Sequence, residues 1–292
     1  MKIYEKDNVV MIEDIADFNI EQTMECGQCF HFEKISELEY GVVSMNKFIH
    51  IRQEEDTLYC MNTTMKDVKE YWINYFDLER NYAEIKTVLI NNDDKLKTAI
   101  EDKYGVRILN QEFEETLISF IISQNKQIPH IKQIVRNISE KYGIFLGNIG
   151  EIKFYSFPGI DTLGRISEDE YREMKTGFRA RYLRDASEKL SSNVITRNEF
   201  ANMGEEDARK LLMSIKGVGE KVANCVMLFG LGYRSSFPVD VWIKRIMEEM
   251  YFDGKDTKKE IISEYAAKNF GDYGGYAQQY LFYYGREKNI GK

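Results

Sequence analysis

Two hydrophobic patterns divide the chain, one typical of strands near its start and one typical of helices over the rest. Between residues 28 and 60, short β-branched or aromatic runs alternate with polar turns such as SMN and QEED, which predicts an antiparallel meander. The predicted strands are FHF (30–32), YGVV (40–43), KFIHI (47–51) and TLYC (57–60). From about residue 65 the apolar positions follow helical spacing, as in EETLISFIISQ and HIKQIVRNISEKYG. We therefore expect an α+β chain, with a sheet domain and flanking helices over residues 1–105 and helical domains over residues 106–292.

One helix has both of its ends marked in the sequence. Ser167 and Glu170 have the spacing of a capping box at its start, and Gly177 stands where a left-handed C-terminal cap belongs. The next segment, GFRARYLRD, is therefore predicted to form a tight corner that carries three arginines, Arg179 among them.

Two further helices with apolar stripes flank the stretch KGVGE. The first helix begins with the acidic run EED, which suits the positive end of a helix dipole, and Gly217 is predicted to end it. Val218 is the side chain that can fill the gap between the helices, so the segment is a predicted helix-hairpin-helix. The stripes are Ala208, Leu211, Leu212 and Ile215 in the first helix, and Val222, Cys225, Val226 and Phe229 in the second.

The glycines of this hairpin suit an anion. Gly217 and Gly219 permit backbone angles that other residues resist, and they leave N–H groups uncovered at a helix N-terminus. A nucleic-acid phosphate is the anion that fits such a turn. An ordinary hairpin with a glycine cap would use the same residues, so the hairpin alone leaves both interpretations open.

Two charged residues favour chemistry over simple binding. Lys221 lies on the first turn of the second helix, where the dipole disfavours a cation, so Glu or Asp would be the usual structural choice. Asp240 precedes another amphipathic helix at the position of its N-cap. The alternative is a solvated lysine and an aspartate that only caps its helix.

Composition and charge limit the class of protein. The 292 residues are 43% hydrophobic, enough for the core of one large or two ordinary domains. The net charge of −8 argues against a partner recognised only through bulk positive charge. Phosphate contacts need only a local basic face and oriented N–H groups, so nucleic acid is still allowed.

The cysteines and the apolar runs bear on location and metals. Cys26 and Cys29 form a CxxC, but no second pair of Cys or His completes a zinc site, so we expect no metal and no cofactor. Scattered cysteines are typical of a reducing compartment. No apolar run reaches the roughly 20 residues of a membrane span, and the start of the chain does not resemble a signal peptide. We expect a cytoplasmic protein with no membrane partner.

The hairpin and the segment around Asp240 carry a family resemblance. GVGEKVA (217–223) followed by FPVDV (237–241) resembles the signature of the helix-hairpin-helix DNA glycosylase superfamily, in its bifunctional branch with a lysine nucleophile. Further segments resemble the 8-oxoguanine DNA glycosylases in order, so the resemblance covers nearly the whole chain. They are CGQCF (26–30), YFDLE (75–79), GVRILNQ (105–111), LISFIISQN (117–125), GFRARYL (177–183) and YAQQYLF (276–282).

The resemblance implies a fold and a reaction. The fold is mainly α-helical, of the helix-hairpin-helix glycosylase type, with an N-terminal antiparallel β-sheet domain. The reaction is excision of 8-oxoguanine from duplex DNA, followed by strand scission at the abasic sugar. The amine of Lys221 would attack C1′, displace the base and form a Schiff base that permits β-elimination. Asp240 would be an ionised carboxylate near the sugar that also caps its own helix.

The resemblance also places residues around the flipped base. The backbone carbonyl of Gly27 would accept from N7–H, the group that 8-oxoguanine has and guanine lacks. Phe282 and Cys225 would sandwich the ring, Gln278 would bind its Watson–Crick edge, and Pro238 is counted with them. Core packing at helical spacing is the alternative for Phe282 and Cys225.

The opposite strand is expected to meet another set of residues. Asn125 and Arg179 match family residues that read the cytosine left without its partner, and Phe178 stands where many members have a tyrosine wedge. His130 occupies a position where much of the family carries a second arginine. A neutral imidazole lacks the bidentate fork of a guanidinium, so we predict a weak preference for cytosine. The hairpin residues expected to hold DNA are Lys216, Gly217, Val218 and Gly219.

Two alternatives are open. One is a glycosylase of the same superfamily for another damaged base, although the cysteine cluster of the thymine-glycol branch does not follow Cys225 and the alkylation branch lacks a residue like Lys221. The other is a non-catalytic helix-hairpin-helix module, which would have no use for Lys221 together with Asp240. We expect a monomer whose partner is double-stranded DNA containing 8-oxoguanine.

Overall fold

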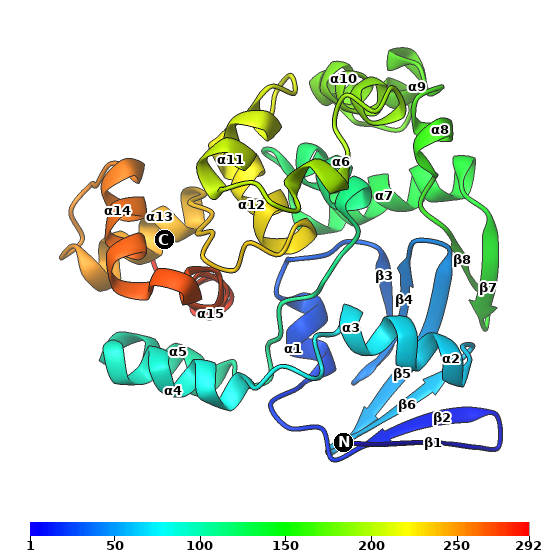
Figure 1. Cartoon of the computed structure of the whole chain (residues 1–292), viewed down its shortest axis with the longest axis horizontal. Helices are drawn as coiled ribbons and strands as arrows, with labels where there is room; N and C mark the ends of the chain where they lie inside the picture. Colours follow the sequence, from blue (N-terminus) through cyan, green and yellow to red (C-terminus); the bar gives the residue numbers. More distant parts are fainter. Residues whose placement is uncertain (292) are drawn as a thin grey trace.

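The N-terminal part of the chain forms a six-stranded antiparallel sheet (Figure 1), described in a computed structural model that covers residues 1–291. The strand order is β1-β2-β6-β5-β4-β3, in which β3 to β6 form the predicted antiparallel meander. The strand predicted at FHF (30–32) is displaced, because β3 begins only at Phe32. The strands are β1 (Lys2–Lys6), β2 (Val9–Glu13), β3 (Phe32–Ser36), β4 (Glu39–Ser44), β5 (Lys47–Glu54) and β6 (Thr57–Met61).

Register places apolar side chains in rows across this sheet. Tyr40, Ile51, Cys60 and Val10 lie opposite one another on four successive strands, and each is at most 1% exposed. Such cross-strand rows stabilise a sheet and fix its register, because a one-residue slip would turn the row toward solvent. The row belongs to a core that also holds the buried Trp72.

The strands β1 and β2 were not predicted, although the two residues between them are typical of a hairpin turn. Asp7 and Asn8 join them with φ of 53° and 61°, the positive angles of a type I′ turn that suits a two-residue hairpin. A second hairpin, β7 (Phe145–Ile149) and β8 (Ile152–Tyr155), interrupts the region predicted to be almost wholly helical. Phe154 of this hairpin stacks on Phe48 of β5 at 4.3 Å between ring centroids, so tertiary packing holds it.

The rest of the described chain is mostly helical, and the predicted α+β architecture is confirmed. Helix α5 packs against α15, and α4 packs against α5 and α14 (Figure 1). The predicted division after residue 105 stays a prediction. No helix among residues 1–291 is long and apolar enough to span a membrane. The helices are α1 (Ile20–Glu25), α2 (Met65–Asp67), α3 (Ile73–Tyr75), α4 (Tyr82–Asn92), α5 (Asp94–Asp102), α6 (Phe113–Ser123), α7 (Ile128–Tyr142), α8 (Ile160–Leu163), α9 (Glu168–Glu173), α10 (Ala180–Ser191), α11 (Glu205–Met213), α12 (Glu220–Gly230), α13 (Val241–Tyr251), α14 (Lys259–Phe270) and α15 (Gly274–Glu287).

Helix α12 is the centre of the helical part. It packs against α6 and α11, and every residue from 222 to 230 is buried. The predicted apolar stripe was therefore too narrow, because neighbours cover α12 on all sides. Its first turn is the part that reaches the surface, and this turn carries Lys221.

The capping box predicted at Ser167 and Glu170 is confirmed, with reciprocal hydrogen bonds between the two residues. The end of that helix differs from the prediction. Helix α9 ends at Glu173, and Lys175 (φ 64°) is the first left-handed residue after it. Gly177 is also left-handed, with φ of 62°, but it begins the 3-10 turn that leads into α10.

Candidate active site

The turn between α11 and α12 depends on Gly217. Helix α11 ends at Met213, four residues before the predicted end at Gly217, and Gly217 then takes a φ of 76°. A Cβ on Gly217 would lie 2.4 Å from the ring of Tyr182, so both the backbone angle and the close approach require glycine. Val218 is 5% exposed and fills the space between the helices, as predicted.

Gly219 is explained differently. It is the N-cap of α12, with φ of −96° and ψ of 179°, an extended conformation open to any residue. A Cβ on Gly219 would meet nothing within 4 Å. Neither strain nor crowding within the described chain requires glycine here, whereas a close external approach to the N-terminus of α12 would.

Lys221 projects from the first turn of α12 toward the end of α6. Its Nζ donates to Ser123 Oγ at 3.5 Å and lies 5.3 Å from the ring centroid of Phe120. The side chain is partly buried. The amine is therefore held between a hydroxyl and an aromatic face.

Asp240 caps α13. Its Oδ1 accepts a hydrogen bond from the backbone N–H of Ile243 at 2.8 Å, which confirms the predicted N-cap. The carboxylate also lines the cleft that contains Lys221. Asp240 is thus a structural cap whose charge faces an open site.

One cleft of about 420 Å³ brings together predicted residues that are far apart in the sequence. They come from the loop after α1 and from the starts of α12 and α13, with an aromatic ring from α15. These residues are Gly27, Lys221, Asp240 and Phe282.

The loop that holds Gly27 presents a carbonyl. Gly27 has a φ of 86°, and a Cβ on it would lie 3.3 Å from Phe282 Cε1. The neighbouring carbonyls of Cys26 and Gln28 accept from side-chain amides of glutamines at 3.1 Å and 2.8 Å. Within residues 1–291 no comparable bond reaches the carbonyl of Gly27. This carbonyl is therefore available to a ligand.

Gln278 and Phe282 lie one turn apart on the same face of α15. Gln278 is 5% exposed, and its Oε1 is buried with no hydrogen-bond partner in the described chain. A buried acceptor without a donor costs free energy, and such atoms are often found at functional sites.

Cys225 lies one turn after Lys221 and is 4% exposed. Burial raises the pKa of its thiol to about 11, an effect that the Asp240 charge adds to and the Lys221 charge opposes. The thiol is neutral at physiological pH and packs as apolar surface. Cys225 and Pro238 are both buried and are not among the residues that line the cleft.

Comparisons with known proteins decide the family. Residues 10–117 match the model of the 8-oxoguanine DNA glycosylase N-terminal domain, and residues 118–270 match the HhH-GPD superfamily base excision DNA repair proteins. The chain belongs to the 8-oxoguanine DNA glycosylases.

Individual relatives of this glycosylase agree with that assignment. A solved structure of MBOgg1 with a low-affinity DNA ligand is 40% identical, with a TM-score of 0.95 and 99% of both chains covered. The 8-oxoguanine glycosylase/lyase of Clostridium acetobutylicum, solved with duplex DNA containing cytosine opposite 8-oxoguanine, is 35% identical, with the same TM-score and coverage. The Arabidopsis thaliana N-glycosylase/DNA lyase OGG1 is 28% identical over 91% of this chain and 77% of its own.

The residues expected to face the opposite DNA strand do not line the cleft. Their neighbours at positions 126–129, between Asn125 and His130, do line it. Asn125, Phe178 and His130 are exposed, and Asn125 has a left-handed φ of 49°. Arg179 is 4% exposed, and its guanidinium donates to the backbone carbonyls of Gln124, Asn125 and Thr176.

Arg179 therefore ties the corner that carries Phe178 to the turn that carries Asn125. Phe178 is 53% exposed. The guanidinium carbon of Arg179 lies 4.3 Å from the centroid of its ring. In the hairpin, Lys216 is exposed and lies 3.5 Å from a carboxylate oxygen of Asp185.

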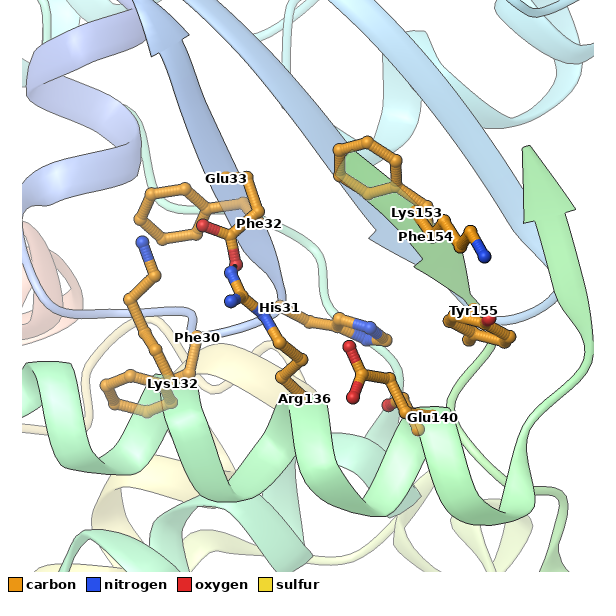
Figure 2. A pocket seen from close by; sticks show the side chains of 11 residues that line it. Phe30, His31, Phe32, Glu33, Lys132, Arg136, Glu140, Lys153, Phe154 and Tyr155 are labelled. Atoms are coloured by element: carbon orange, nitrogen blue, oxygen red, sulfur yellow. Dashed lines mark hydrogen bonds and ion pairs between the residues drawn. The ribbon is translucent and has the colours of Figure 1, made fainter. Parts of the chain in front are cut away.

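A second hollow lies between α7, β3 and β8 (Figure 2) and shares only Phe30 with the lining of the cleft. Arg136 reaches from α7 to pair with Glu33 of β3, and Lys132 lies 3.7 Å from the ring centroid of Phe32. Lys221 and Asp240 do not line it. Its charged side chains serve to join the sheet to α7.

Several residues that line the cleft were not predicted from the sequence. Phe30 and Phe120 line it, as do Lys126 and Arg286. Arg286 could have been found, because it lies one turn after Phe282 on the same helix face. The described residues contain no group of three or more His, Cys, Asp or Glu suited to a metal ion.

Proposed function

We propose that this protein excises 8-oxoguanine from duplex DNA and then cleaves the strand at the abasic sugar. The main support is that one cleft contains the amine of Lys221, the carboxylate of Asp240 and the free backbone carbonyl of Gly27. The relatives named as glycosylase/lyase enzymes, one of them solved on DNA with 8-oxoguanine, support the same substrate and reaction.

Lys221 supplies the nucleophile in this proposal. Its neutral amine forms a bond to C1′ while the glycosidic bond breaks and the base leaves with the bonding electrons. The nitrogen then loses a proton, and its lone pair breaks the C1′–O4′ bond while O4′ takes up a proton, which gives a ring-opened, protonated Schiff base. Removal of a C2′ proton from this Schiff base breaks the C3′–O bond and expels the 3′ phosphate. Lys221 lies on the first turn of α12, so its amine reaches the cleft from the N-terminal end of that helix.

Asp240 stabilises the positive charge that develops on the sugar and can move protons between steps. Its place in the same cleft as Lys221 supports this role. The helix cap holds the carboxylate in one orientation, because Oδ1 is fixed on the N–H of Ile243. A preorganised charge of this kind loses nothing to reorientation during the reaction.

The base pocket discriminates by hydrogen-bond polarity. The Gly27 carbonyl accepts from N7–H of 8-oxoguanine, whereas guanine would face it with a second acceptor. The buried Oε1 of Gln278 takes up a donor from the Watson–Crick edge. Phe282 and Cys225 stack on the two faces of the ring, with Pro238 as part of the wall.

DNA is held by the hairpin and by the corner before α10. The hairpin backbone at residues 216–219 receives a phosphate at the N-terminus of α12. Phe178 fills the space that the flipped nucleotide leaves, and Asn125, His130 and Arg179 face the opposite strand. In this arrangement Arg179 must exchange some of its backbone carbonyl partners for a base.

The state of the protein in the cell is part of the proposal. All four cysteines are free and buried, which supports a reducing compartment such as the cytoplasm. The enzyme acts as a monomer, which light scattering on a size-exclusion column would test.

The reaction is tested with a duplex that contains one 8-oxoguanine and an identical duplex with guanine. We expect release of free 8-oxoguanine and cleavage of the strand at that position, with no cleavage of the guanine duplex. An enzyme inactive on 8-oxoguanine but active on another damaged base would refute the substrate assignment and leave the glycosylase chemistry standing.

A further inference from the structure

Arg286 contacts the parts of the base pocket that come from both ends of the chain. It lies on α15, one turn after Phe282 and two turns after Gln278, so all three occupy the same helix face. It lines the cleft that contains Lys221 and Asp240. Its guanidinium carbon is 5.4 Å from the ring centroid of Phe282.

The guanidinium is anchored on the loop that leads to Gly27. Arg286 Nη2 donates to the backbone carbonyl of Glu25, the last residue of α1, at 2.8 Å. Helix α1 has no basic residue in its own last turn, so Arg286 supplies the cation that favours a helix C-terminus. Gln279, also on α15, donates to the carbonyl of Cys26 at 3.1 Å. Two successive carbonyls before Gly27 are thus fixed from one helix.

The other arm of the guanidinium lies against Gly27 itself. Arg286 Nη1 is buried without a hydrogen-bond partner in the described chain, 3.1 Å from where a Cβ on Gly27 would be. Leaving a charged donor unpaired costs stability, which its contact with the aromatic ring of Phe282 only partly offsets. The unpaired Nη1 of Arg286 lies against Gly27, the residue proposed to recognise the lesion. Its cost in stability therefore indicates that Arg286 is there for function rather than for folding.

We propose that Arg286 is a positioning residue that sets the direction of the Gly27 carbonyl. The inference rests on the proposed function, in which this carbonyl recognises N7–H of 8-oxoguanine. Gly27, with φ of 86°, has no side chain to restrain it, so the peptide planes held before it limit the directions that its carbonyl can take. Arg286 fixes those planes through Glu25 and couples them to Phe282, which stacks on the same base.

The test separates recognition of the base from chemistry at the sugar. Arg286→Met keeps most of the stem and removes the guanidinium, and Arg286→Lys keeps a charge that can reach one carbonyl. Single-turnover rates are measured on a duplex with 8-oxoguanine and on the same duplex with a preformed abasic site. We expect Arg286→Met to slow base excision about 10- to 100-fold, since small misplacements in a site have effects of this size. Cleavage of the abasic duplex stays at the wild-type rate, and Arg286→Lys restores part of the excision.

Lys288→Met is the matched control, because it removes one charge from the same end of the chain at a side chain 49% exposed and paired with Asp102. It should leave both rates unchanged. Equal losses of both activities in Arg286→Met, or unchanged excision, would overturn the positioning role. Wild-type protein that cleaves abasic DNA but does not excise 8-oxoguanine would instead overturn the proposed substrate, so the two failures can be told apart.

Discussion

Asp240 combines a structural and a chemical role in one side chain. Replacing it with asparagine separates them, because asparagine caps a helix as well as aspartate does but carries no charge. We expect the free energy of unfolding of Asp240→Asn to lie within about 1 kcal/mol of the wild-type value. Excision should slow by at least about 100-fold, the usual effect of losing a positioned acid or base.

Urea denaturation, fluorescence anisotropy with duplex DNA and single-turnover excision check these points. Duplex affinity should stay near that of wild type. Asp240→Ala is the control, since it loses both the cap on Ile243 and the charge. If Asp240→Asn excised 8-oxoguanine at the wild-type rate, Asp240 would have no role in the reaction and would serve only as the N-cap of α13.

His130 sets the expected response to the opposite base. It is exposed on the first turn of α7, where its imidazole cannot make the bidentate contact of an arginine. We expect comparable excision of 8-oxoguanine opposite each of the four bases, and a gain in cytosine preference for His130→Arg. Parallel rate measurements on four duplexes decide the point. A strong cytosine preference in the wild-type enzyme would refute it.

At the scale of elements, the hairpin offers a matched pair of glycines. Gly217→Ala should destabilise the fold by about 1–3 kcal/mol or more, because a residue with φ of 76° is strained and the ring of Tyr182 lies 2.4 Å from the new Cβ. Gly219→Ala meets no atom and no strain, so its free energy of unfolding should change by less than about 1 kcal/mol.

DNA affinity should rank these variants differently from stability. Gly219→Ala places a methyl group where a phosphate approaches the N-terminus of α12, so we expect duplex binding to weaken several-fold in a well-folded protein. Thermal denaturation and anisotropy measure the two quantities separately. If Gly219→Ala binds DNA as tightly as wild type, the hairpin is not the phosphate contact.

Local signals explain which elements were predictable. The capping box at Ser167 and the cap at Asp240 are decided by residues within one turn, so the sequence alone predicts them. The full burial of α12 depends on α6 and α11 packing around it, which no local pattern encodes. The hairpin of β7 and β8 likewise owes its place to the contact of Phe154 with Phe48.

At the scale of the whole molecule, the buried thiols predict how stability depends on pH. Burial raises the pKa of Cys60 to about 12 from its usual 9.0, so the folded state keeps this thiol neutral while the unfolded chain ionises it. Its contribution to stability is complete below pH 9 and is lost as pH rises toward 12. Cys60→Val should make the fall in unfolding free energy between pH 9 and 11 shallower by about 1.4 kcal/mol per pH unit.

Urea denaturation in reducing buffer at several pH values measures that slope. Cys60 lies in the sheet core, away from the cleft, so Cys60→Val should keep wild-type excision. Identical slopes for the two proteins would show that the Cys60 thiol is not held neutral by the fold.

The candidate site was only partly predictable, because its contacts join residues that are far apart in the sequence. Local patterns predict the places of Lys221 and Asp240 at helix starts. Their chemical roles, like those of Gly27 and Phe282, are predicted by the family resemblance. The bonds from Gln111, Gln279 and Arg286 that leave the Gly27 carbonyl free join segments up to 261 residues apart. Only the folded chain brings these donors together.

Lys221 is the proposed nucleophile of this cleft. Borohydride trapping on a duplex with one 8-oxoguanine tests it directly, because reduction makes the Schiff base permanent. We expect wild-type protein to form a covalent adduct and Lys221→Gln to form none while it still binds the duplex. Trapping that survives in Lys221→Gln would show that a group other than Lys221 forms the Schiff base.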